Sequence, residues 1–184
     1  EVPAEWNEVD GALSDIGPNV VATPDLSRVF TGWLDDSSRT WEVPGVMVGV
    51  NADFLNDLDK EEAVDYFFDS RLTESCTDQN YEEYDDSWYV GVFAMATGCG
   101  PYNAGVVVVA ASPVEDRSVH TVYVVLQMIS EADFEAGDHV LNTFYADSAF
   151  GAPGGARTHS GHHTGRSTPV CVWAIPAAHG GHAM

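Results

Sequence analysis

Apolar residues in the second half of the chain gather in three runs that are each typical of a β-strand. The runs lie at 88–97, 104–112 and 119–129, and they are rich in the valine and aromatic residues that strands favour. Connections of about six residues separate them, which is too few for the crossover helix that parallel strands require. The pattern therefore predicts an antiparallel meander of three strands.

One further strand and several helices are predicted around this meander. The run at 41–50 is strand-like. Apolar residues spaced three and four apart predict helices at 24–34, at about 57–72 and at about 130–145. Ser130, followed three residues later by Asp133, resembles a capping box at the start of the last helix. We therefore expect an α+β fold in which two or three helices pack on an antiparallel sheet made of the meander and the earlier strand.

Charge divides the chain abruptly. The 184 residues contain 29 Asp and Glu against seven Lys and Arg, which gives a net charge of −22. Every acidic residue precedes residue 148, whereas the glycine- and histidine-rich end of the chain has none. We expect an N-terminal helical or linker segment at 1–38, an α+β sandwich domain at 39–147 and a disordered tail at 148–184.

This composition excludes several classes of partner. A strongly acidic surface repels the phosphates of nucleic acids, so we expect no nucleic-acid binding. There is no apolar run long enough for a transmembrane helix, so we expect no membrane insertion. The chain opens without a basic segment and apolar run of the signal-peptide type, which predicts a processed mature form or a fragment of a longer chain.

The three cysteines allow two interpretations. Cys76 follows the central predicted helix and Cys99 lies in the first turn of the meander, while Cys171 lies in the tail. In an exported protein Cys76 and Cys99 would form a disulfide, and in a reducing cytosol they would remain two unpaired thiols. The absence of a C-x-x-C pair argues against a structural zinc site or a thioredoxin-type centre.

The acidic and aromatic segment at 78–86 is the most distinctive candidate site. It places carboxylates beside tyrosines, and Ca²⁺ binds clusters of carboxylate oxygens. The candidate Ca²⁺ ligands are Asp78, Glu82, Asp85 and Asp86. Their spacing does not match the EF-hand pattern, and a solvated acidic loop explains the segment more simply. We therefore predict no metal site and no cofactor, with the calcium-stabilised module as an alternative.

No motif in the sequence indicates catalysis. There is no nucleophile elbow and no phosphate-binding loop. A hydrolase with a pair of carboxylates remains an alternative, although no pair stands out among the 29 acidic residues. His120 and His139 are expected to be surface or half-buried residues, and the histidines of the tail are expected to bind metals only nonspecifically. We therefore predict no catalytic residues.

Five short motifs follow one another between residues 40 and 144. They are a strand with Val43–Val46, Cys76 before the acidic loop, Tyr89-x-Gly91 at the start of a strand, Cys99-Gly100 at its end, and Leu141–Phe144. With this order the chain resembles the C-terminal accessory domain of secreted or membrane-anchored serine proteases of actinobacteria. The order of elements is also similar to the PsbP-like sandwich of LpqN-type lipoproteins.

The resemblance implies a non-catalytic module of the cell envelope or the extracellular space. Such a module binds a protein or a small molecule, or positions a neighbouring enzyme, and the protease triad lies in a different domain. We expect this chain to be monomeric and to bind its partner through Tyr81, Tyr84, Trp88 and Tyr89. Exposed tyrosine and tryptophan side chains are effective anchors for partners.

Overall fold

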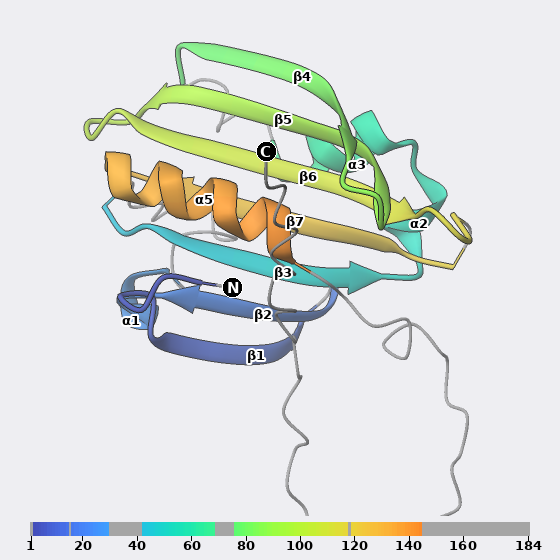
Figure 1. The fold of residues 1–184 in the computed structure, drawn as a ribbon, viewed down its shortest axis with the longest axis horizontal. Helices are drawn as coiled ribbons and strands as arrows, with labels where there is room; N and C mark the ends of the chain where they lie inside the picture. The colour runs from blue at the N-terminus through green and yellow to red at the C-terminus, as the bar shows by residue number, and fades with distance from the viewer. Residues whose placement is uncertain (1, 15, 30–41, 69–75, 118, 145–184) are drawn as a thin grey trace, which may run out of the picture.

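One antiparallel sheet of seven strands forms the centre of the molecule, in the order β1-β2-β3-β7-β6-β5-β4 (Figure 1). This computed structural model describes residues 2–14, 16–29, 42–68, 76–117 and 119–144. The strands are β1 (Glu8–Ser14), β2 (Gly17–Thr23), β3 (Gly45–Asn51), β4 (Asp78–Asp85), β5 (Tyr89–Cys99), β6 (Ala104–Pro113) and β7 (Thr121–Met128). The helices are α1 (Leu26–Val29), α2 (Phe54–Asp57), α3 (Lys60–Phe67) and α5 (Glu131–Thr143).

Helices cover both faces of the sheet. In Figure 1 α5 crosses the front of the sheet over β7, while α2 and α3 lie behind it. The inner strand β6 shows why this arrangement forms, because every residue from Ala104 to Ser112 is buried. A strand that is apolar on both faces is stable only between two covering layers. The fold is therefore α+β with the sheet as its middle layer.

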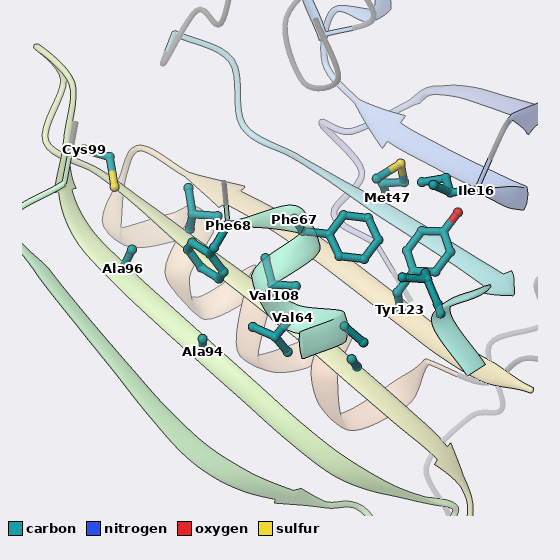
Figure 2. Packing of buried hydrophobic residues seen from close by; sticks show 14 of the residues in the cluster. Ile16, Met47, Val64, Phe67, Phe68, Ala94, Ala96, Cys99, Val108 and Tyr123 are labelled. Atoms are coloured by element: carbon teal, nitrogen blue, oxygen red, sulfur yellow. The ribbon is translucent and has the colours of Figure 1, made fainter. Parts of the chain in front are cut away.

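The core on the α3 side is built from small strand residues facing larger helix residues. Val64 and Phe68, from α3 and its end, pack over Ala94 and Ala96 of β5 (Figure 2). Phe67 points toward Tyr123 of β7, with the two ring centroids 5.0 Å apart. The short alanine side chains let the helix approach the sheet closely, and close packing of this kind maximises the buried apolar surface. The face opposite has its own core, in which Val140 and Phe144 join Leu126 and Met128.

The structure confirms the predicted antiparallel meander and the predicted last helix. β5 pairs with β6, and β6 pairs with β7, in antiparallel register. The earlier strand is β3, which lies beside β7. The capping box of α5 is present, because the Ser130 side chain accepts from the backbone of Asp133 and the Asp133 side chain accepts from the backbone of Ser130. No helix among the described residues is long and apolar enough to span a membrane.

Three of the expected elements need correction. Residues 8–23 form β1 and β2, which extend the sheet beyond β3, rather than a helical or linker segment. The helix expected at about 57–72 is α3, which Asp59 caps as expected but which ends at Phe67, and a separate single turn of helix, α2, precedes it. The expected acidic loop at 78–86 is mostly the strand β4. Of the helix expected at 24–34, Leu26–Val29 form α1. Residues 30–34 and the tail at 148–184 lie outside the described residues.

The predicted disulfide is present between Cys76 and Cys99. Cys76 lies two residues before β4 and Cys99 is the last residue of β5, so the bond closes the open end of the β4–β5 hairpin. The side chain of Cys99 is fully buried in the core on the α3 side. Cys171 lies outside the described residues.

Candidate binding surface

The turn of the β4–β5 hairpin is held by the carboxylates that precede it. Asp86 Oδ1 accepts hydrogen bonds from the backbone N–H groups of Trp88 (2.9 Å) and Tyr89 (2.7 Å). Asp85 Oδ1 accepts from the backbone N–H of Ser87 (3.1 Å), and Ser87 has a positive φ of 75°. Asp side chains stabilise tight turns by accepting from backbone groups one to three residues further on. The turn is therefore rigid for a local reason that is encoded in its sequence.

Trp88 is presented at the tip of this turn. Its side chain is 58% exposed, while its backbone oxygen accepts a hydrogen bond of 2.9 Å from the N–H of Val114, the residue that follows β6. Val114 is also exposed. The tip surface, defined here as Trp88 and Val114 with the neighbouring carboxylates Asp85 and Asp86, thus combines an apolar centre with an acidic rim.

Tyr84 and Tyr89, two of the four predicted binding residues, are buried. Tyr89 is 2% exposed and Tyr84 is 9% exposed. Both rings stack on Phe144, with centroid distances of 5.3 Å for Tyr89 and 6.1 Å for Tyr84. The Tyr84 hydroxyl lies 2.9 Å from the backbone oxygen of Leu141 and 2.8 Å from Asp86 Oδ2. Burial is the main cause that raises the pKa of Tyr84, and the hydrogen bond to Asp86 raises it further. These two tyrosines hold the hairpin against the end of α5 and are shielded from solvent.

Tyr81 is exposed, but it lies along the strand on the α3 side and not at the tip. Its hydroxyl donates a hydrogen bond to the carboxylate of Asp65 in α3. Gln79 Nε2 donates to the same hydroxyl at 2.6 Å. Burial, the hydrogen bond to Asp65 and the charges of Asp65 and Glu61 raise the pKa of Tyr81 to about 12. The structure therefore divides the four predicted residues between two faces, and Trp88 is the one at the tip.

The carboxylates of β4 do not converge on one point. An extended strand rises by about 3.3 Å per residue, which separates Asp78 from Asp85 by about 23 Å along the strand. Among the described residues there is no group of three His, Cys, Asp or Glu side chains that could hold a metal ion. The geometry of β4 therefore gives no support to the calcium-stabilised alternative.

One acidic side chain in the described part of the chain is shielded from solvent, and its role bears on the hydrolase alternative. Asp133 is the one buried acidic residue there. Its Oδ2 accepts from the backbone N–H groups of Ser130 (2.9 Å) and Ile129 (3.2 Å) at the start of α5. These bonds cap a helix. The one shielded carboxylate thus has a structural role.

A buried polar cluster that the sequence did not reveal lies where α2 and α3 meet the start of β7. Lys60 Nζ donates a hydrogen bond of 2.6 Å to Oγ1 of Thr121, which is fully buried. The same hydroxyl is 3.3 Å from the backbone oxygen of Leu55. His120 is 1% exposed, and neither of its ring nitrogens has a hydrogen-bond partner in the described structure. The expectation that His120 is a surface or half-buried residue was therefore wrong.

The burial of His120 makes the stability of the fold depend on pH. Burial lowers the pKa of His120 below its ordinary value of 6.5, and the positive charge of Lys60 lowers it further by a smaller amount. As the pH falls, the imidazole of His120 is therefore protonated in the unfolded chain before it is protonated in the folded chain. The free energy of unfolding decreases as the pH falls through the pKa that His120 has in the unfolded chain. The loss is at most about 1.4 kcal/mol per pH unit for a single group.

We expect the free energy of unfolding, measured by denaturant titration, to fall between pH 7.5 and pH 5.5. The fall should shrink in His120→Phe, because the buried titrating group is gone. His139→Phe is the matched control, since His139 is exposed on α5, and it should keep the fall. An equal fall in wild type and His120→Phe would show that His120 is not responsible.

Comparison with known proteins gives no match: no family model, no curated protein and no solved structure matches the chain. The resemblance to a protease accessory domain therefore stays a prediction. The function has to be inferred from the surface itself.

Proposed function

We propose that the chain is a non-catalytic binding domain that acts in the extracellular space or cell envelope and captures a protein partner through the tip surface. Its partner would be a secreted enzyme, such as a protease, to which the domain is attached or beside which it acts. The observation that carries this proposal is the exposure of Trp88 on a turn fixed by hydrogen bonds from three successive backbone groups.

An exposed tryptophan on a rigid turn is suited to binding for a physical reason. Association costs free energy because side chains and loops lose freedom, and a turn that is already ordered avoids much of that cost. Tryptophan is enriched among the residues that contribute most to protein interfaces. Tyr84 and Tyr89 serve the same end indirectly, because their stacking on Phe144 anchors the hairpin.

The disulfide supports a setting outside the cytoplasm. Disulfides persist in oxidising compartments and are rare in the reducing cytosol. The bond between Cys76 and Cys99 spans the hairpin that carries Trp88. The proposed binding element is thus also the element that the disulfide closes.

Site-specific photo-cross-linking tests the proposal. Trp88 is replaced with p-benzoylphenylalanine in the full chain, in the cells that produce it, and irradiation is followed by mass spectrometry. Tyr102 is the matched control position, because it is 50% exposed but lies in the β5–β6 turn at the opposite end of β5. We expect a cross-linked partner from position 88 that is absent from position 102.

The native side chain is tested in the same cells. Trp88→Ala should lower recovery of that partner on the tagged chain, whereas Tyr102→Ala should not. Identical cross-linked products from both positions, or none from position 88, would rule out the tip surface as the binding site.

A further inference from the structure

The strand β4 lies at the edge of the sheet and is regular along its whole length. It is the last strand in the sheet order, and Figure 1 shows it as the outermost strand beyond β5. Its register with β5 runs without a shift from Asp78 opposite Thr97 to Asp85 opposite Val90. Among the described residues no strand pairs with its outer side. A regular edge of this kind can accept a further strand.

The hydrogen-bonding direction of each β4 residue follows from the turn. The backbone N–H of Asp86 donates to the oxygen of Tyr89 (3.3 Å), so this pair is a hydrogen-bonded pair of the ladder. Such pairs alternate along an antiparallel ladder, and in each of them both backbone groups point to the partner strand. The even-numbered residues of β4 therefore face β5. The residues that direct N–H and C=O outward are Gln79, Tyr81, Glu83 and Asp85.

The side chains beside this edge are acidic on both faces of the sheet. Asp78 and Glu82 lie on the face of α5, and Glu83 and Asp85 lie on the face of α3, as the period of two along a strand requires. All four are exposed, and residues 76–102 include no Lys or Arg. Like charges directly opposite each other destabilise a pair of strands, whereas opposite charges stabilise it. The edge is therefore closed to a second copy of itself and open to a basic strand.

We propose that an extended, Lys- or Arg-bearing segment of the protein partner adds to the outer edge of β4 as a further antiparallel or parallel strand. This inference rests on the proposed function and specifies the chemistry of the partner. Backbone hydrogen bonds from the outward-facing residues hold the segment, and its basic side chains pair with the flanking carboxylates. Trp88, just beyond the end of β4, anchors the residues that follow.

The test uses the full-length oxidised chain and a capped eight-residue peptide of alternating lysine and threonine, which matches the eight residues of β4. Amide hydrogen exchange is measured by NMR with and without peptide. The amides of Gln79, Tyr81, Glu83 and Asp85 should gain protection on binding. The alternate amides already bonded to β5 and those of the other edge strand, β1, should not change.

Two comparisons separate a strand from simple charge attraction. Glu83→Pro removes one outward N–H and leaves the bonds to β5 in place, and Glu83→Gln is its control because it removes only the charge. We expect Glu83→Pro to bind the peptide about tenfold more weakly than Glu83→Gln. A peptide of equal charge with proline in place of two threonines makes the same comparison on the wild-type chain. Its result does not depend on how stable the Glu83→Pro variant is.

Strand addition would be supported by protection of alternate β4 amides together with weaker binding in both proline experiments, that of the Glu83→Pro variant and that of the proline-containing peptide. Peptide binding without that protection, equal affinity for the proline-containing peptide, or no binding at low salt would each overturn it. A cross-linked partner at Trp88 combined with any of these negative results would leave the proposed function standing and refute only the strand.

Discussion

Replacing Cys76 and Cys99 together with alanine is expected to lower the free energy of unfolding by about 3 kcal/mol. The disulfide joins residues separated by 23 positions, and its loss restores the freedom of that loop in the unfolded chain. The measurement is denaturant unfolding of the oxidised wild type and of the double variant at pH 7.5.

Two controls accompany this comparison. Wild type unfolded in the presence of reductant should match the double variant, while Cys171→Ala, which keeps the bridge, should match oxidised wild type. Coincident unfolding curves for wild type and the double variant would show that the bridge contributes nothing to stability.

Gly91→Ala is expected to cost a similar amount, about 3 kcal/mol, because it forces a side chain between two backbones. A Cβ at Gly91 would lie 2.1 Å from the backbone oxygen of Ala110 and 2.6 Å from the Cα of Ala111. Both atoms belong to β6, so the clash can be relieved only by moving two paired inner strands, β5 and β6, apart. The melting temperature and the denaturant midpoint should both fall.

The matched control is Gly11→Ala in the edge strand β1, where the glycine is exposed. That variant should differ little from wild type, because an exposed strand position accepts alanine. If Gly91→Ala were as stable as Gly11→Ala, the close approach of β5 and β6 at this position would be refuted.

The part of the fold that the sequence predicted is the part whose stability comes from side-chain burial. The β5–β6–β7 meander and β3 have apolar runs because helices cover both sides of the sheet. The last helix was predicted from its capping box and its apolar positions, and both features are local.

The edge strands could not be predicted in this way. In β4 only Tyr84 is buried, so the apolar period that would identify a strand is missing. Its stability comes from backbone pairing with β5, which leaves no pattern in the sequence, and from the disulfide, whose cysteines mark a cross-link but do not indicate a strand. The same reason applies to β1, where Val9 is exposed although it lies within a strand.

The candidate site was predicted in composition but not in arrangement. The sequence showed an acidic and aromatic segment, and of its aromatic residues Trp88 and Tyr81 are exposed. The turn reverses the chain at Trp88, so Tyr84 and Tyr89 both face α5, and this depends on the position of the turn to a single residue. A one-residue error in a strand exchanges its two faces. His120 directly precedes β7, in which seven of eight residues are buried, and this position beside a strand that is buried on both faces was the signal available for its burial.

The position of the disulfide has a consequence for survival among proteases. Cys76 lies before the hairpin and Cys99 at its end, so the bond encloses the whole acidic strand and the exposed turn. Exposed turns are preferred sites of cleavage. A single cut at Ser87 or Trp88 would therefore leave two polypeptides that remain covalently joined, with β4 still tied beside β5. The domain can lose the continuity of its backbone at its most accessible point without losing either half.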